Sequence, residues 1–370
     1  MEAIKSDTME EEELNPYIDD YPFIGRTEYL EKWEKNWKNH KIFGIFGMQC
    51  VGKSRTVWEF LRWKKKQCEE KCFLKSVHID LRKVENLDII RIRLLAEIVG
   101  HSLEKYEDDT SWMESVISAI KENSKTIFAI VMDNAEDIIL GPLKDKFLTL
   151  CQKLVFSSGV TNVKMFIVST CEFLIASKKR VFFKDEMKPM NEDEGMRLLK
   201  EVVRDSVFGL DEHAAQIVKL SGSLPSVIIM SGSEMTEDGG LLTPTELIEL
   251  LMKCRLEILS REFYPEEERT DILMKNFINR LSTILRDQMA ILSYIPGTFD
   301  DETATGMLDH ESPAMAKHKS LIPLRKHHML EYDQDNRRFN IHGLLKDCLN
   351  IMDIIKDYPS KILTCLIDII

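Results

Sequence analysis

Residues 42–54 read Ile-Phe-Gly-Ile-Phe-Gly-Met-Gln-Cys-Val-Gly-Lys-Ser, an apolar run followed at once by a glycine-rich turn. From Gly47 onward the stretch matches the pattern G-x-x-x-x-G-K-[ST], which binds phosphate where it joins a strand to a helix. The glycines let backbone N–H groups curve around phosphate oxygens, and the positive end of the following helix adds to the attraction. We therefore expect Gly47, Gly52 and Lys53 to hold a nucleoside phosphate and Ser54 to hold Mg²⁺.

A second apolar strand supplies the acid that such a site needs. The run 127–132 is apolar and ends in Asp133, which we expect to hold Mg²⁺ opposite Ser54. The next position is Asn134, where a fast ATPase commonly carries a second acid that activates water, and Glu136 comes two residues later. The sequence therefore predicts nucleotide binding with slow or no hydrolysis.

Strands and helices alternate through the first half of the chain. Strand patterns cover residues 41–46, 73–81, 126–132 and 164–169, and helix patterns cover residues 55–66, 86–103 and 142–156. This alternation predicts an α/β domain with a parallel sheet.

After Pro189 the patterns are mainly helical. Helices are predicted from Asn191 and over residues 213–220, 226–235 and 244–254. Residues 270–295 predict one longer helix with an apolar stripe made of Leu273, Phe277, Leu281, Ile284 and Leu285. A hairpin over residues 329–341 and a helix from Leu344 then predict a winged helix.

These patterns divide the chain into five segments. They are a flexible acidic leader at 1–21, a P-loop nucleotide-binding domain at 22–188, a helical domain at 189–262, a winged-helix domain at 263–356, and a tail or the start of a further region at 357–370.

Composition narrows the possible partners and the compartment. The 370 residues include 50 basic and 62 acidic side chains, a net charge of −12, which argues against nucleic acid as a partner. The longest apolar runs hold about six residues, against the ~20 that cross a bilayer, so no membrane partner is expected. The eight scattered cysteines and the acidic start predict reduced thiols in a cytoplasmic protein.

Several further stretches resemble the NB-ARC, or apoptotic-ATPase, branch of the STAND P-loop switches. Besides the P-loop, the matching stretches are Phe23–Glu28, Val131–Glu136, Phe166–Thr170, Met187–Glu194, Ser223–Pro225 and Phe339–His342, in the family's order. Together they cover about residues 22–355.

The resemblance implies roles for particular residues. Ile24 and Arg26 would contact ATP or ADP near the adenine and phosphates, Pro225 would pack on the base, and His342 would reach the ADP β-phosphate. The expected cofactor-binding set is completed by Arg55, after the P-loop serine, and Thr170, at the end of the sensor strand. Simpler interpretations stay open: Arg26 as a surface cap, Pro225 as a helix-start proline and His342 as a polar residue opening the last helix.

Three positions depart from the family pattern. Cys171 stands where the sensor strand usually has arginine, Ser223 replaces the glycine of Gly-x-Pro, and Gly343 replaces the acid of Met-His-Asp. Each change weakens either hydrolysis or the lock on the ADP state.

The resemblance implies a switch that self-associates on binding ATP and controls signalling assembly with partner proteins, in apoptosis-like or innate-immunity-like pathways. The leader is too short for an effector domain, so the chain is either the bare switch or part of a larger receptor. One alternative is a winged-helix DNA-binding regulator reading with residues 342–353, whose cations are only His342 and Lys346, beside Asp347 and Asp353. The other alternative is a conventional P-loop ATPase.

Overall fold

The computed structural model describes residues 22–68, 73–82, 84–100, 111–175, 181–204, 207, 209–236, 242–258, 269–352 and 354. The predicted acidic leader and C-terminal tail lie outside the described residues, as does the predicted boundary at 262. The described chain forms two compact units, one built from residues up to Phe46 with Lys53–Met187, the other from Gly47–Gly52 with residues from Lys188 on. The five-segment division stays a prediction.

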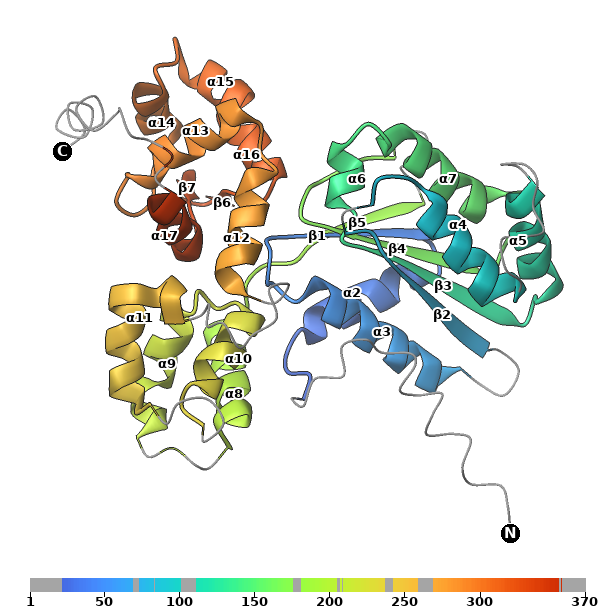
Figure 1. Ribbon diagram of the computed structural model, residues 1–370, viewed down its shortest axis with the longest axis horizontal. Helices are drawn as coiled ribbons and strands as arrows, with labels where there is room; N and C mark the ends of the chain where they lie inside the picture. The colour runs from blue at the N-terminus through green and yellow to red at the C-terminus, as the bar shows by residue number, and fades with distance from the viewer. Residues whose placement is uncertain are drawn as a thin grey trace. The chain divides into compact units, whose positions relative to one another are not determined.

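The first unit is built on a five-stranded sheet (Figure 1). Its strands are β1 Ile42–Phe46, β2 Phe73–Asp80, β3 Thr126–Asp133, β4 Val163–Ser169 and β5 Phe182–Glu186. Their order is β2-β3-β4-β1-β5 and all four pairings are parallel. The predicted α/β fold with a parallel sheet is therefore confirmed. The edge strand β5 is an addition that the sequence pattern does not predict.

Helices cover both faces of this sheet, which explains why the central strands are apolar throughout (Figure 1). One face carries α2 Thr27–Trp37 and α3 Lys53–Gln67; the other carries α4 Asp88–Leu94, the π-helical turn η1 Leu95–Val99, α5 Ser111–Glu122, α6 Glu136–Leu140 and α7 Lys144–Phe156. Under α2 and α3 the core is aromatic: Trp33 lies against Phe60 and Phe166, and Phe166 stacks on Phe43.

A buried carboxylate fixes α2 to the edge strand. The Nε1–H of Trp33 donates to Asp185 on β5 across 2.7 Å, and Lys32 pairs with the same carboxylate. Asp185 is only 3% exposed, so these donors satisfy an acid that would otherwise be costly to bury. This arrangement fixes the middle of α2 to the carboxyl end of β5.

The second unit begins with four helices, as predicted. They are α8 Glu192–Val203, α9 Leu210–Leu220, α10 Pro225–Ser233 and α11 Pro244–Ile258. The side chain of Asn191 caps α8 by accepting the N–H of Glu194 at 2.8 Å.

The single long helix predicted over 270–295 is wrong. The structure has two helices, α12 Thr270–Asn279 and α13 Thr283–Ser293. Ser282 has extended ψ and its side chain accepts the N–H of Leu285, so it is the N-cap of a new helix. The direction change takes Ile284 out of the predicted apolar stripe and leaves it 70% exposed.

The remaining elements form the winged helix. They are α14 Asp301–Leu308, the continuous helix made of α15 Pro313–Ala316, the π turn η5 Lys317–Leu321 and α16 Ile322–Lys326, the hairpin strands β6 Glu331–Asp333 and β7 Arg338–Asn340, and α17 Gly343–Met352. The hairpin is antiparallel, and Phe299 pairs with Phe339 at its edge. The predicted hairpin and final helix are confirmed.

Within the described residues, no helix combines the length and apolar character that crossing a bilayer requires.

Candidate nucleotide-binding site

The hydroxyl of Ser54 and the carboxylate of Asp133 meet at the carboxyl end of the sheet. Ser54 lies in the first turn of α3, and its Oγ–H donates to Asp133 Oδ1 across 2.8 Å. Asp133 is fully buried at the end of β3 and also accepts the N–H of Asn134 at 2.9 Å. A hydroxyl and a carboxylate oxygen are the ligand types that Mg²⁺ prefers. The two residues therefore fit the predicted magnesium role, with remaining positions for water and phosphate.

The P-loop contains three residues with positive φ. Gly47, Cys50 and Gly52 all have positive φ, at 148°, 64° and 87°. Lys53 comes next and is buried, with 8% of its surface exposed. Arg55 lies one residue beyond Ser54 and forms an i,i+4 ion pair with Glu59 at 3.2 Å, along the helix.

The end of β2 contributes a polar network that the sequence pattern does not reveal. Asp80 is paired in register with Asp133, and its Oδ1 accepts the amide of Asn134 at 2.9 Å. Arg82 donates to both oxygens of Asp80 through its N–H and its guanidinium. Burial would raise the pKa of Asp80, but the hydrogen bonds from Arg82 and Asn134 and the positive charge of Arg82 lower it below its ordinary value. The carboxyl group of Asp80 is therefore ionised at neutral pH.

His78 lies two residues before Asp80 on β2, and its side chain is close to that of Asp133. Its Nε2 is 3.5 Å from Asp133 Oδ2, and its ring lies 5.3 Å from that of Trp58. The sequence signals only that His78 and Asp80 share a side of β2, because alternate residues of a strand lie on one face; it does not signal their partners.

The end of β4 and the residue after it are hydrogen-bonded to the turn that follows Asp133. The buried Glu136 accepts the N–H of Thr170 at 3.2 Å, and Ala135 donates its N–H to the carbonyl of Val168. Thr170 is 3% exposed, and Cys171 is buried beside it. Glu136 therefore holds the turn that carries Thr170.

Arg26 and Ile24 lie in the turn before α2. Gly25 and Arg26 both have left-handed backbone conformations, with φ of 72° and 61°. The Arg26 guanidinium lies 5.7 Å from the centre of the Tyr29 ring, and the residue is 4% exposed. Arg26 is the N-cap residue of α2, as the simpler interpretation expects, but it is buried and not at the surface. Ile24 is half-buried.

Pro225 lies against the P-loop. A Cβ built on Gly52 would be 3.5 Å from Pro225 Cγ. Pro225 is also the first residue of α10, as the helix-start interpretation expects. The same residue therefore starts a helix and contacts the P-loop. The turn before it, residues 221–224, contains Gly222 and Ser223, both with positive φ.

His342 is hydrogen-bonded to that turn. Its Nε2 is 2.9 Å from the carbonyl oxygen of Gly222, and its Nδ1 is 3.3 Å from the backbone nitrogen of Leu344. Because a carbonyl only accepts and a backbone N–H only donates, the ring carries its proton on Nε2 and is neutral. Burial lowers the pKa of His342. The ring thus fills the expected helix-opening role and also joins the winged helix to the turn before Pro225.

An ion pair flanks this contact. Arg255 on α11 donates to Asp347 on α17 at 2.6 Å and, through Nη1, to the carbonyl of Leu220 at 2.8 Å. A Cβ on Gly343 would lie 3.3 Å from this guanidinium. The position that carries an acid in the resembling family therefore faces Arg255.

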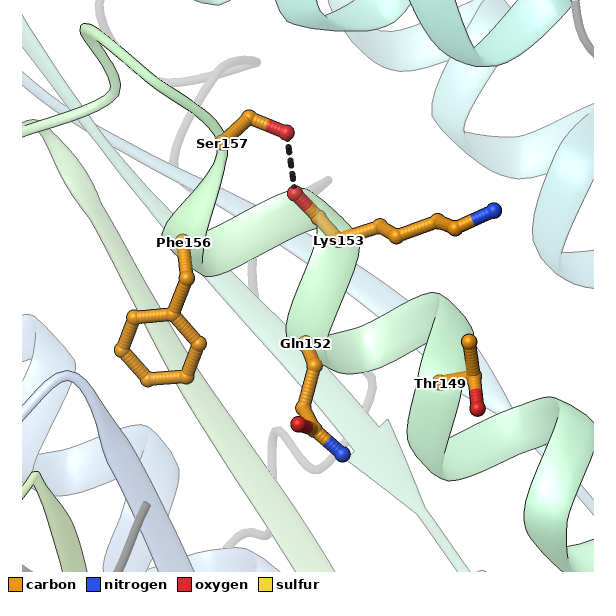
Figure 2. A pocket seen from close by; sticks show the side chains of 5 residues that line it. All are labelled: Thr149, Gln152, Lys153, Phe156 and Ser157. Carbon is orange, nitrogen blue, oxygen red and sulfur yellow. Dashed lines mark hydrogen bonds between the residues drawn. The ribbon is translucent and has the colours of Figure 1, made fainter. Parts of the chain in front are cut away.

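A cavity at the end of α7 lies away from these residues. It has a volume of about 320 Å³ and runs along the last turns of the helix, lined by Thr149, Gln152, Lys153, Phe156 and Ser157 (Figure 2). Figure 2 shows the Ser157 hydroxyl bonded to the carbonyl of Lys153, which closes the end of the helix. None of the predicted site residues contributes to this cavity, and we assign it no role in nucleotide binding.

Comparison with known proteins supports the fold. No protein-family model matches the sequence, and no curated protein matches it. Among solved structures, a Walker-type ATPase of Pyrococcus abyssi aligns with a TM-score of 0.60 and 14% identity, over 89% of this chain and 96% of that chain. The ORC2 protein of Aeropyrum pernix, solved as ADPNP–ADP complexes, aligns with a TM-score of 0.56 and 13% identity, over 95% of this chain and 97% of that chain.

At these identities the likeness concerns the fold alone. The chain has a P-loop NTPase fold followed by a helical region and a winged helix. The structure brings together Ser54 with Asp133, Gly52 with Pro225, and His342 with Gly222.

Proposed function

We propose that this protein is an ATP/ADP-binding switch of the STAND type, with an NB-ARC-like core and slow or no hydrolysis. The observation that carries the proposal is a chain of contacts from the P-loop to the winged helix. Gly52 lies against Pro225, the turn before Pro225 contains Gly222, and Gly222 is bonded to His342. A change in the P-loop on exchange of nucleotide would thus be felt by the winged helix through one short turn.

Nucleotide would be held by residues with separate tasks. Lys53 and the P-loop N–H groups would bind the phosphates, and Ser54 and Asp133 would hold Mg²⁺, which neutralises phosphate charge. The half-buried Ile24, the buried Arg26, the sensor residue Thr170 and the helix residue Arg55 are proposed to complete the cofactor site. His342 is proposed to act on the Gly222 turn, and so on the nucleotide indirectly.

Slow hydrolysis is expected from the surroundings of Asn134. Its amide is bonded to Asp80, and both oxygens of Asp80 are taken by Arg82 and Asn134. The acid at this edge of β2 is therefore unavailable to accept a proton from water. We propose turnover below about one per minute, against the ~1–10³ s⁻¹ of typical enzymes.

A switch needs two states that nucleotide binds differently, because only such a difference shifts an equilibrium. We propose that ATP favours a self-associating state, in a cytoplasmic setting and with further protein partners. Apoptotic or immune signalling, which the family resemblance implies, finds no support in the fold comparison, and we do not propose it.

Titration calorimetry with ATP and ADP tests the nucleotide site. Lys53→Ala should lower both affinities at least tenfold, because a neutral side chain cannot replace the cation at the phosphates. Lys66→Ala, an exposed position on the same helix, is the matched control and should bind as the wild type does. If a folded Lys53→Ala variant bound ATP and ADP with the affinities of the wild type, the proposed nucleotide site would be rejected.

Steady-state turnover and light scattering test the switch itself. A slow rate together with a larger mass in ATP than in ADP is the expected result. A turnover near 1 s⁻¹ with an unchanged mass would instead identify a conventional P-loop ATPase.

A further inference from the structure

The winged helix contains a helix-turn-helix whose second helix differs from the one expected. Helix α14 ends at Leu308, and the next helix begins at Pro313 after the turn 309–312. Two helices joined by a turn of three to four residues define this motif, and its second helix is the one that enters the DNA major groove. The helix in the second position of this motif is Pro313–Lys326, and not residues 342–353.

The last helix α17 is unsuited to that task. Lys346 donates its ammonium to the carbonyls of Ile295 and Gly297, at 2.8 and 3.4 Å, and His342 is bonded to Gly222. Lys346 on α17 and His342 just before it are thus both bonded inside the protein.

Charge is strongly segregated onto the helix Pro313–Lys326. Residues 313–328 contain four lysine or arginine side chains and three histidines, and no aspartate or glutamate. The whole chain has a net charge of −12, so this stretch runs against the overall balance. A local basic surface can bind phosphate even where the net charge is negative, because screening limits each interaction to about 8–10 Å.

The cations lie on one exposed face. Ala316, Ser320, Leu321 and Leu324 point into the core, each fully buried. The exposed residues of the same helix include Lys317, His318, Lys319, Ile322, Arg325 and Lys326. Hence the charged residues are presented outward by the packing of the helix, and one apolar side chain stands among them.

Three of these cations remain available. Lys317 is paired with Asp301 on α14, and this ion pair weakens the attraction of Lys317 for a phosphate. Among the described residues no carboxylate lies within ion-pair distance of Lys319, Arg325 or Lys326. Arg325 instead lies over the ring of Tyr332 on the wing strand β6, 5.6 Å from its centre.

We propose that the exposed face of Pro313–Lys326 binds duplex DNA, with Lys319, Arg325 and Lys326 on backbone phosphates. Ile322, 47% exposed at the centre of the face, would lie against base edges, where apolar side chains contact the thymine methyl group. Arg337, exposed at the turn of the hairpin, would add a further cation. This binding goes beyond the proposed nucleotide switch and does not depend on it.

Fluorescence anisotropy of the full chain with a labelled random duplex of 20 base pairs tests the proposal. Three phosphate contacts predict a slope of log K against log salt of about −2.7, so affinity should fall about fortyfold between 50 and 200 mM salt. The double variant Lys319→Ala/Lys326→Ala should bring the slope to about −0.9. The variant Lys319→Arg/Lys326→Arg should keep the wild-type slope.

Two controls separate this face from general charge effects and from the nucleotide site. Lys65→Ala/Lys66→Ala removes the same charge from exposed positions on α3 and should leave DNA binding unchanged. Lys53→Ala should also leave it unchanged, even where nucleotide affinity falls.

Absence of binding at 50 mM salt overturns the proposal, as does an unchanged slope in the folded Lys319→Ala/Lys326→Ala variant. Binding of polyglutamate with no binding of the duplex would overturn it as well, since the face would then select an acidic peptide.

Discussion

The Nε2–H of His342 donates to the carbonyl oxygen of Gly222 across 2.9 Å, and the two residues are 120 positions apart in the chain. The approach is so close that a Cβ on Gly222 would be 2.1 Å from the Cε1 atom of His342. Gly222 also has a φ of +66°, which side chains adopt with strain. The contact therefore needs both the imidazole and the bare glycine.

A methyl group at position 222 should clash with the His342 ring and destabilise the fold. Gly222→Ala should lower the free energy of unfolding by about 1–2 kcal/mol for backbone strain and by roughly a further 1–3 kcal/mol for overpacking. Gly297→Ala is the matched control, because Gly297 has φ +77° with nothing within 4 Å of its added Cβ. Gly297→Ala should lower the free energy of unfolding only by the backbone-strain contribution. Urea unfolding of both variants measures the difference.

A double-mutant cycle checks whether the His342 ring causes the loss of stability in Gly222→Ala. In His342→Ala/Gly222→Ala the ring that causes the clash is absent, so the two changes should be non-additive. Additive losses would mean that the Gly222 backbone alone accounts for the effect.

Acidification should weaken the His342 contact. Burial lowers the pKa of His342, so the folded state favours the neutral ring, and the charges around it are Glu331, Arg255 and Asp347. The unfolded chain then binds more protons below its ordinary pKa of about 6.5, and stability is lost as the pH falls from there toward the folded pKa. A new proton would sit on Nδ1, against the N–H of Leu344.

Urea unfolding of wild type and His342→Ala at pH 7.5 and 5.5 measures this loss. The wild type should lose more stability on acidification than the variant. Equal losses would assign the pH dependence to other groups.

Asn134→Asp should destabilise the protein. The Asn134 amide donates to Asp80 across 2.9 Å, and a carboxylate there would face another carboxylate. We expect a loss of roughly 1–3 kcal/mol at pH 7.5, partly recovered at acidic pH where the pair takes up a proton. Asn336→Asp is the control: its amide bonds Asp333 at 2.6 Å on the exposed hairpin, where solvent screens the charges and the change should cost little. Thermal or urea unfolding that ranks the two variants equally would contradict the prediction.

Lys164 should make stability rise with alkaline pH. Burial, aided by the nearby charges of Lys41 and Lys64, lowers the pKa of Lys164 to about 8. Its ammonium donates to the carbonyls of Trp37 and His40. Between the folded pKa and the unfolded value of about 10.4 the unfolded chain holds the extra proton, so stability increases with pH in that window. Lys164→Met should flatten this rise in unfolding free energies measured at pH 7.5 and 9.5; an identical rise would assign it elsewhere.

Much of the first unit can be predicted from the sequence. The strands ending at Phe46 and Asp133 are apolar on both faces, so their pattern is unambiguous, and the P-loop motif requires a turn and a helix directly after Phe46. The edge strand Phe182–Glu186 is missed because two of its central residues, Lys184 and Asp185, are charged. Only the position of Trp33, on a distant helix, makes burial of Asp185 favourable.

Other features depend on contacts that a sequence pattern does not encode. The apolar spacing across residues 270–295 continues through Ser282, and only the capping hydrogen bond reveals the break. The helix Pro313–Lys326 is hard to place from the sequence because Pro323 disfavours a helix there. Asp80 bonds its neighbour Arg82 but also the distant Asn134, and His342 bonds Gly222, 120 positions away. Neither residue's full set of partners can therefore be derived from its neighbours in the chain.

The π turn Lys317–Leu321 accommodates Pro323 and also rotates the helix. The N–H of Ile322 bonds the carbonyl of Lys317, five residues back, so one extra residue is inserted. Pro323 has no N–H, and its ring would crowd the carbonyl of Lys319 in a regular helix; a π turn relieves such crowding. Each helical residue turns the chain by about 100°. Deleting one residue of this turn would therefore put Arg325 in the buried place of Leu324. The helix is thus expected to accept substitutions on its outer face but not a change in length.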